Sequence, residues 1–117
     1  MEKIDPINIP NVNFSIKVDN VEKAEIYKKQ RLERGFDDTE TWNLDSTIAA
    51  FIVPRLKRFK EINAGYPPEL TEEQWNEILD KMIKFFEFAS DDSKFLEENI
   101  YQEGFDLFHE YFSSLWW

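Results

Sequence analysis

Residues 71–86 read TEEQWNEILDKMIKFF and carry the clearest structural signal in the chain. Thr71 and Gln74 have the spacing of a capping box, in which the Thr71 hydroxyl accepts from the Gln74 amide and the Gln74 side chain bonds back, so a helix begins here. Apolar residues then recur at steps of three and four, as on one face of a helix. They are Trp75, Ile78, Leu79, Met82, Ile83 and Phe86. Phe85 and Phe88 fall off this stripe, which predicts a second contact surface, either with the terminal helix or with a partner.

Three more helices are predicted around this one. They are residues 21–34, residues 45–62 and residues 93–115. Asn20 can cap the first, and Gly35 ends it, because Gly readily adopts the left-handed conformation found after helix C-termini. The second keeps one apolar phase across Pro54, which favours a single kinked helix over two separate ones. Between these two helices, Asp37 or Asp38 is a plausible N-cap for a short helical piece. The last helix is apolar on two sides, as in a helix buried centrally or in an oligomer.

Residues 1–20 follow a different pattern. Apolar and polar side chains alternate from Val12 to Val18, which is the period of a half-buried strand. A single strand cannot satisfy its own backbone, so this one pairs with residues 4–9, pairs with the same strand of another subunit, or lies as an extended arm on the helices. The extended arm and the intermolecular pairing are favoured, because Pro6 and Pro10 limit residues 4–9 to an edge.

The chain is therefore predicted to be mainly α, a small helical bundle of about four helices with an extended or β-strand N-terminal arm. Its 117 residues suffice for a single domain over residues 1–117, with the arm at 1–20 and the bundle at 21–117. No apolar segment reaches the ~18 residues needed to span a bilayer, and the N-terminus lacks the apolar core of a signal peptide. We expect a soluble, intracellular protein that does not contact membranes.

Charge is segregated along the chain. Residues 61–117 hold fourteen Asp and Glu against three Lys, whereas residues 1–60 hold eleven Lys and Arg against ten acids. The acidic half repels DNA and RNA, which bind through Lys and Arg facing phosphates, so no direct nucleic-acid partner is expected. Two interpretations follow. Either the basic residues between Lys23 and Lys60 neutralise the acidic half internally, or an acidic face stays exposed for a basic partner.

The chain has few residues suited to catalysis or metal binding. It has no Cys and one His, and its three Gly are too few for a phosphate-cradling loop. The one cluster that could share a helical stripe is Glu103, Asp106, His109 and Glu110. A carboxylate-bridged metal pair, however, takes a Glu-x-x-His from each of two helices. We predict no catalytic residue, no metal and no cofactor, and we do not expect an enzyme.

The four tryptophans fall into two pairs. Trp42 and Trp75 each head a helix, and both are expected in the core, because Trp is usually largely buried. Trp116 and Trp117 end the sequence. Two exposed indoles at a chain end promote aggregation, so this pair either docks back onto the bundle or anchors a partner.

Three blocks of the sequence resemble a family of proteins. Residues 34–45 read RGFDDTETWNLD, residues 72–83 read EEQWNEILDKMI and residues 105–116 read FDLFHEYFSSLW. Over residues 31–117 the chain resembles a widespread family of small phage and prophage proteins, with Trp-Asn-Leu-Asp and Glu-Glu-x-Trp as the more specific blocks. The resemblance implies a phage-encoded accessory protein in the cytoplasm of the bacterial host, and it assigns no catalytic residue.

Together these features predict a protein that acts stoichiometrically on another protein. The leading hypothesis is an inhibitor with anti-defence, anti-CRISPR-like activity, which presents an acidic surface to a basic host enzyme that binds nucleic acid. The expected contact residues are Glu69, Glu72, Glu73, Asp91, Asp92, Glu97, Glu98, Trp116 and Trp117. The alternative is a self-associating phage structural or assembly protein, with a homodimer through residues 12–18 or through the C-terminal helix.

Overall fold

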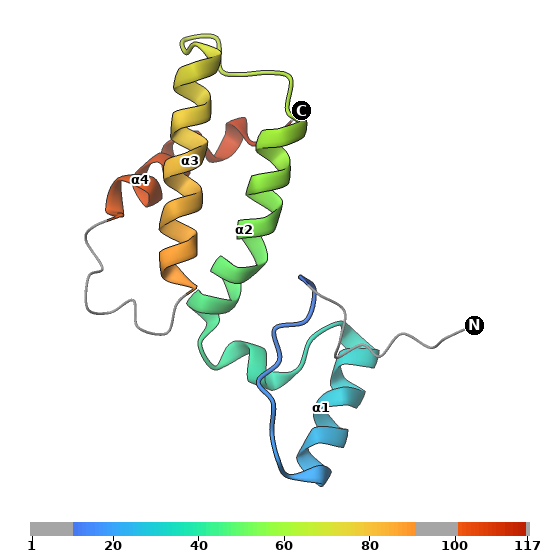
Figure 1. Ribbon diagram of the computed structural model, residues 1–117. Coiled ribbons are helices and arrows are strands. Elements are labelled where there is room, and N and C mark those ends of the chain that lie inside the picture. The colour runs from blue at the N-terminus through green and yellow to red at the C-terminus, as the bar shows by residue number, and fades with distance from the viewer. Residues whose placement is uncertain (1–10, 91–100, 117) are drawn as a thin grey trace.

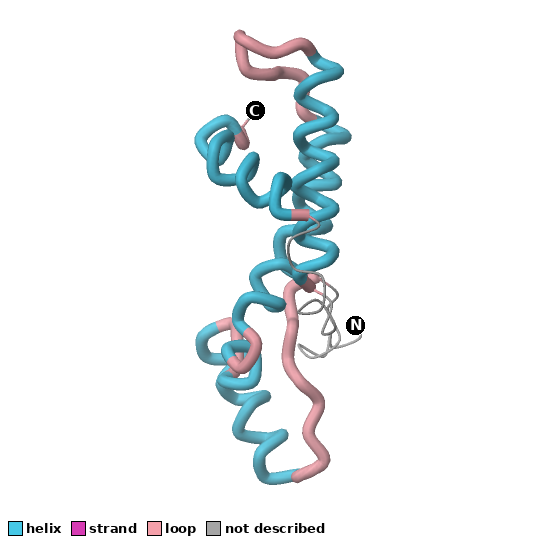
Figure 2. The backbone as a smooth tube through the Cα atoms, turned by 90° about the vertical axis from the view of Figure 1, so that its left-hand side faces the viewer, coloured by secondary structure: helices cyan, strands magenta, loops and turns pink. Residues whose placement is uncertain are grey.

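The computed structural model describes residues 11–90 and 101–116, and the regular structure of these residues is entirely helical. In chain order its elements are α1 (Val21–Arg34), the 3-10 helix η1 (Asp38–Thr41), α2 (Leu44–Ile62), α3 (Glu72–Ala89), α4 (Gln102–Tyr111) and the 3-10 helix η3 (Phe112–Ser114). α2 and α3 lie side by side, α4 packs on α3, and α1 stands at the other end of the molecule (Figure 1, Figure 2). The prediction of a mainly α protein built from about four helices is confirmed.

α3 begins at the predicted capping box and forms the centre of the core. The Gln74 amide donates to Thr71 Oγ1 at 3.1 Å, and the Thr71 amide donates to Gln74 Oε1 at 2.9 Å. The buried core residues are Ala49 and Leu56 of α2 with Trp75, Leu79, Met82, Ile83 and Phe86 of α3. Burial contributes about 1.5–3 kcal/mol for each of the larger side chains. The predicted stripe, including Trp75, is therefore the surface on which α2 and α4 pack.

α4 approaches α3 closely because Gly104 lies where the two helices meet. Gly104 is buried, and a Cβ atom at this position would lie 2.1 Å from a backbone oxygen of α3. The Phe85 ring stacks on Phe105 with centroids 4.5 Å apart, and the Phe88 ring lies 5.2 Å from that of Tyr101. The second contact surface predicted for Phe85 and Phe88 is thus made with α4 and the residue before it.

α4 is shorter than the predicted helix. It begins at Gln102, whereas the sequence pattern predicted a continuous helix from residue 93 to about residue 115. Residues 93–100 lie outside the described residues. Tyr101 has φ −110° and ψ 17°, which is not helical, and the chain tightens into η3 after Tyr111. A continuous helix is therefore wrong at both of these positions.

α1 has both predicted caps. The Asn20 side chain accepts from the Lys23 amide at 2.9 Å. Gly35 adopts a left-handed φ of 88°, which lets its N–H donate to the Arg31 carbonyl at 2.8 Å. α1 packs on η1, which leads into α2 (Figure 1). Val21, the first residue of α1, is 75% exposed.

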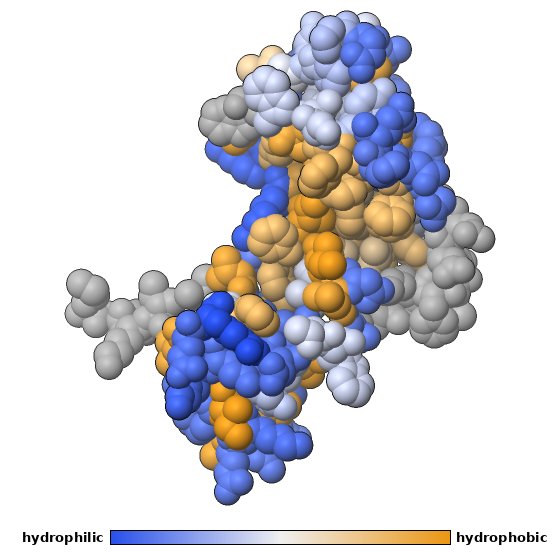
Figure 3. Space-filling model, turned by 180° about the vertical axis from the view of Figure 1, so that it is seen from behind, coloured by the Kyte–Doolittle hydropathy of each residue, from blue (hydrophilic) through white to orange (hydrophobic). Residues whose placement is uncertain are grey.

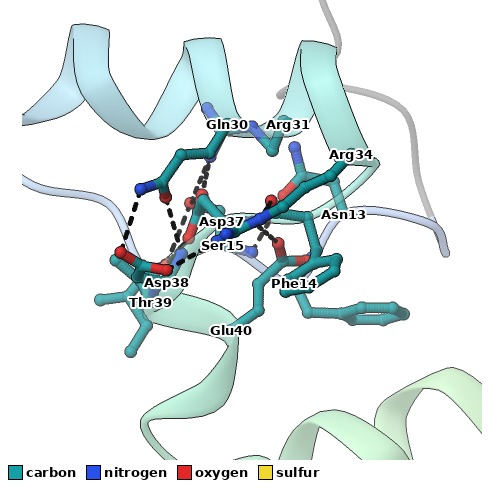
Figure 4. A network of polar contacts seen from close by, with 12 residues as sticks. Asn13, Phe14, Ser15, Gln30, Arg31, Arg34, Asp37, Asp38, Thr39 and Glu40 are labelled. Carbon is teal, nitrogen blue, oxygen red and sulfur yellow. Dashed lines mark hydrogen bonds and ion pairs between the residues drawn. The ribbon is translucent and has the colours of Figure 1, made fainter.

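A buried polar network holds α1, η1 and the N-terminal segment together (Figure 4). We call it the Asp37 network, and it comprises Ser15, Arg31, Asp37, Thr39 and Glu40. Asp37 has no exposed surface and accepts from Ser15 Oγ at 2.6 Å, from the Thr39 amide at 2.7 Å and from the Arg31 guanidinium. The Asp37 amide in turn donates to Glu40 Oε2 at 2.6 Å, which completes a capping box for η1. Asp37 is thus the predicted cap, and it is also the centre of this end of the molecule.

The same network bonds the backbone of the N-terminal segment. Glu40 Oε1 accepts from the Phe14 amide at 2.7 Å, and Thr39 Oγ1 accepts from the Ile16 amide at 2.9 Å. The backbone N–H groups of Phe14 and Ile16 thus already donate to side chains and are not available to a neighbouring strand. Residues 11–20 form neither a helix nor a strand, while residues 4–9 lie outside the described range. The course predicted for the arm as a whole stays a prediction. Pairing with another subunit stays a prediction.

α2 runs as a single helix through Pro54, as predicted. Its apolar stripe is split between the core and the surface, since Ala49 and Leu56 are buried while Ile48 is 52% and Phe51 is 47% exposed. α3 covers one side of α2 only, and α1 lies beyond its N-terminal end (Figure 1). The N-terminal half of α2 therefore presents apolar side chains outward.

The placement of Trp42 in the core is wrong, because its side chain is 79% exposed. Trp42 follows η1, where the chain passes from α1 to α2. The molecule measures 54 × 40 × 19 Å, so it is about two helices thick. No second layer covers this junction among the described elements, and the indole stays in contact with solvent.

Candidate protein-interaction site

The α2–α3 loop and the chain end meet at one end of the molecule and line a cavity of about 420 Å³. The chain end lies beside the last turn of α2 (Figure 1). Glu69 and Trp116, two of the predicted contact residues, both line this cavity, which we call the Trp116 cavity. Other residues that line it are Ile62, Asn63, Tyr66, Pro67, Pro68 and Ser114. The structure thus joins two predicted contact residues that are far apart in the sequence.

The loop that forms one wall is held by local bonds. The Leu70 amide donates to the Pro67 carbonyl at 3.0 Å, and the Asn63 side-chain amide donates to the Gly65 carbonyl at 2.6 Å. Pro67 is buried, and its ring fixes its own φ. These constraints position Tyr66 at the cavity without help from a partner.

The chain end is anchored on the core while its last described indole stays open. The Tyr111 ring lies edge-on to Trp75, with centroids 5.7 Å apart, and Leu115 packs against the core cluster. The Trp116 amide donates to the Ser114 carbonyl at 3.0 Å. The Trp116 side chain is nevertheless 74% exposed. Of the two predictions for this residue, the exposure favours a surface that a partner can contact over docking onto the bundle.

Negative charge gathers around the cavity. Glu69, Glu72 and Glu73 are exposed, and the last two occupy the first turn of α3, where acidic groups interact favourably with the helix dipole. The pKa of Tyr111 is raised, first because burial disfavours the phenolate and then because Glu110 and Glu69 place negative charge nearby. Glu69 therefore places negative charge near Tyr111 as well as at the cavity that it lines.

Cations of α2 neutralise the middle and the end of α3, but not its beginning. Lys60 Nζ lies 2.7 Å from Asp80, and Lys57 Nζ lies 3.5 Å from Glu87. Among the described residues, no ion pair involves the three glutamates near the cavity. Internal neutralisation thus reaches the middle and the end of α3, while the acidic residues at its start stay exposed. A basic partner for them stays a prediction. Within the described residues, the end of α3 that lies toward the Trp116 cavity therefore carries exposed carboxylates that form no ion pair.

Five predicted contact residues fall outside the part of the chain that the structure describes. They are Asp91, Asp92, Glu97, Glu98 and Trp117. The other four lie at one end of the molecule, since Glu69 and Trp116 line one cavity and Glu72 and Glu73 follow at the start of α3. We call these four residues the acidic end.

A second exposed surface was not predicted from the sequence. A groove of about 510 Å³, the waist groove, lies between the N-terminal segment, η1 and α2. Its exposed apolar residues are Val12, Phe36, Leu44, Ile48 and Phe51. Figure 3 shows apolar side chains gathered in a band across the middle of the molecule, between two more hydrophilic ends. Periodicity alone could not reveal the groove, because Ile48 and Phe51 are in phase with apolar residues that do face the core.

Two other kinds of site are not formed by the described residues. No three His, Cys, Asp or Glu side chains among them converge on a point that could hold a metal ion. Glu103 accepts from Lys81 at 2.9 Å, and Asp106 accepts from the Gln102 side-chain amide at 3.1 Å. Two carboxylates of the cluster considered for the last helix thus bond to other side chains rather than to a common point. No helix within residues 11–90 and 101–116 has the length and apolar character to cross a bilayer.

The sequence matches no protein-family model, no curated protein and no solved structure. The resemblance of residues 31–117 to phage proteins therefore stays a prediction. The acidic end and the waist groove are the two features of the described residues that bear on function.

Proposed function

We propose that this protein binds a second protein stoichiometrically through its acidic end and thereby inhibits it. The partner is a basic, nucleic-acid-binding enzyme of a bacterial host, most concretely a nucleic-acid-guided nuclease. The protein itself is a phage-encoded anti-defence factor, similar in action to anti-CRISPR proteins, which works in the host cytoplasm.

One observation carries this proposal. Glu69, Glu72 and Glu73 are exposed and have no ion pair with a described residue. Glu69 lines the same cavity as the exposed indole of Trp116, and Glu72 and Glu73 follow in the first turn of α3. Clustered carboxylates attract a positively charged surface from a distance and orient it on encounter. An aromatic side chain at the same place supplies apolar contact area, which is the usual energetic centre of an interface. An enzyme that holds nucleic acid presents the Lys and Arg that such a surface complements.

The proposal predicts binding that weakens with salt and depends on these carboxylates. We expect the variant with Glu69→Gln, Glu72→Gln and Glu73→Gln to bind a purified guided nuclease of the host about tenfold more weakly, because exposed charge pairs contribute ~0.2–1 kcal/mol each. Isothermal titration at increasing salt concentrations measures this effect. The nucleic acid of the nuclease should compete with the native protein for the same surface.

A matched control separates local from overall charge. The variant with Glu22→Gln, Glu25→Gln and Glu33→Gln removes the same number of charges from α1, at the far end of the molecule (Figure 1). It should bind as the native protein does. Equal weakening by the two variants, or no complex of the native protein at low salt, would contradict the proposal.

A second candidate function is that of a self-associating phage structural or assembly protein. The waist groove supports it, because monomeric proteins rarely expose contiguous apolar patches of this kind. The Phe14 amide already donates to the Glu40 side chain, and the Ile16 amide donates to the Thr39 side chain, both in η1. Contact between two copies would therefore rely on apolar burial in the groove rather than on strand pairing through those two amides.

Ile48→Asp tests this second function. If two copies meet through the groove, sedimentation of the native protein should show a dimer at high concentration, and Ile48→Asp should abolish it, because burying a carboxylate without a partner is costly. Ile26→Asp is the matched control, since Ile26 is 54% exposed and Ile48 is 52% exposed, but Ile26 lies outside the groove. If the native protein stays monomeric at every concentration, this second function is ruled out.

A further inference from the structure

We propose that the Trp116 cavity receives one arginine side chain of the partner protein. This inference rests on the proposed function and adds to it the residue type that the partner contributes. Three properties of the cavity select this occupant: apolar walls, two accessible aromatic rings and one carboxylate that lacks a cation.

The walls suit the aliphatic part of a long side chain. Ile62, Pro67 and Pro68 line the cavity with apolar surface. Arginine can lay its methylene stem along such a surface while its charged head reaches a polar position. The volume of about 420 Å³ lies near the lower end of the range of ligand pockets, ~300–1,000 Å³. The cavity therefore suits one long side chain better than a cofactor or a folded segment.

The rings suit the guanidinium. Trp116 and Tyr66 both line the cavity, and their side chains are 74% and 49% exposed. A cation is attracted to the face of an aromatic ring, and tryptophan is the strongest of the three ring types. The same contact occurs elsewhere within this chain, where the Arg55 guanidinium lies 3.8 Å from the centre of the Phe51 ring.

The charge completes the site. Glu69 lines the cavity and forms no ion pair with any described residue. A carboxylate in this position can accept from a guanidinium that stacks on the neighbouring indole, and charge-assisted bonds of this type are among the stronger ones. Glu72 and Glu73, at the start of α3, extend the negative potential that attracts a cation.

Arginine fits this combination better than lysine does. Its head is planar, weakly hydrated and able to stack on a ring while its N–H groups donate in the plane to a carboxylate. The lysine ammonium is compact and strongly hydrated, so it gains less from the rings. A phosphate group is excluded as an occupant, because Glu69 would repel it.

The test uses the full-length protein and a small probe, N-acetyl-arginine amide. The four indole N–H signals of the protein are followed by NMR during titration and assigned with Trp116→Phe and Trp42→Phe. We expect the Trp116 signal to shift and saturate with a Kd on the order of 1 mM. The Trp42 signal is a built-in control, because Trp42 is 79% exposed yet does not line this cavity.

Matched probes and one variant define the chemistry. N-acetyl-citrulline amide has the shape of the arginine probe without its charge, and it should leave Trp116 unmoved. N-acetyl-lysine amide should bind several-fold more weakly than the arginine probe. Glu69→Gln should weaken arginine binding about tenfold, because bonds to charged groups are the stronger class, whereas Glu22→Gln should not change it.

The inference is overturned if Trp116 does not respond, if citrulline acts as well as arginine, if lysine binds as tightly, or if Trp42 shifts as much as Trp116. These outcomes are separate from a failure of the proposed function. A guided nuclease that binds through Glu69, Glu72 and Glu73, while the arginine probe leaves Trp116 unmoved, would retain the proposed function and remove the arginine cavity.

Discussion

Replacing Arg31 with Ala is expected to lower the free energy of unfolding by about 3–5 kcal/mol, the usual effect of removing one partner of a buried ion pair. Asp37 has no exposed surface, and Arg31 is 7% exposed. The substitution therefore leaves a buried carboxylate without its cation. Ser15 and Thr39 still donate to Asp37, but these neutral donors do not supply the lost charge. Native domains have a total free energy of unfolding of only about 5–15 kcal/mol, so this loss is large. We expect α1 and the N-terminal segment to detach first.

Urea unfolding followed by circular dichroism, together with hydrogen exchange of the α1 amides, measures this loss. Arg34→Ala is the control, because Arg34 and Asp38 form an exposed pair at 2.6 Å. The pKa of Asp38 is lowered, chiefly by its hydrogen bond from Arg34, so the control should raise that pKa toward its ordinary value. Its effect on stability should be far smaller, since exposed ion pairs contribute little. An equal loss of stability in both variants would show that the buried network does not hold this end of the molecule.

Gly104→Ala is expected to separate α4 from α3 and to destabilise the protein by about 2–4 kcal/mol, at or above the usual range for overpacking. The added Cβ would lie 2.1 Å from the Lys81 carbonyl oxygen and 2.9 Å from Phe85 Cβ. Neither atom belongs to the flexible end of a side chain, so one helix must move as a whole. Alanine improves helix propensity by only about 1 kcal/mol, which does not offset the loss of the contacts between the helices.

Gly65→Ala provides the matched control for this experiment. A Cβ at Gly65 meets nothing within 4 Å, so the change should stay within about 0.5 kcal/mol. Thermal unfolding gives the stabilities, and hydrogen exchange in α4 shows whether this helix has detached. If Gly104→Ala unfolds at the same temperature as Gly65→Ala, the close approach of α3 and α4 is not what positions the chain end.

The elements that could be predicted from the sequence depend on short-range interactions. The Thr71–Gln74 capping box, the Asn20 cap and the Gly35 terminus all join groups within four residues of one another. The stripe of α3 likewise repeats at the period of a single helix. Such features depend only on residues that are close together in the sequence, and the folded structure contains them as predicted.

Two predictions failed, the burial of Trp42 and a continuous last helix, and the exposure of Ile48 and Phe51 and the burial of Asp37 were not predicted at all. Trp42 is exposed because η1 joins α1 to α2 without a covering layer, and no nearby residue signals that absence. Ile48 and Phe51 have the phase of core residues but line the waist groove. The burial of Asp37 also depends on donors from an earlier segment and from α1, which adjacent residues do not specify.

The candidate site could likewise be predicted only in part. The residue types of the acidic end, carboxylates at the start of α3 and an indole near the chain end, were evident in the sequence together with the excess of negative charge. The sequence did not show that Glu69 and Trp116 meet in one cavity, because they are brought together by the packing of α4 on α3 and by the rigid loop after α2. Local propensities act over a few bonds, whereas the proximity of distant side chains follows from the burial of the whole core, and coordinates are needed to see it.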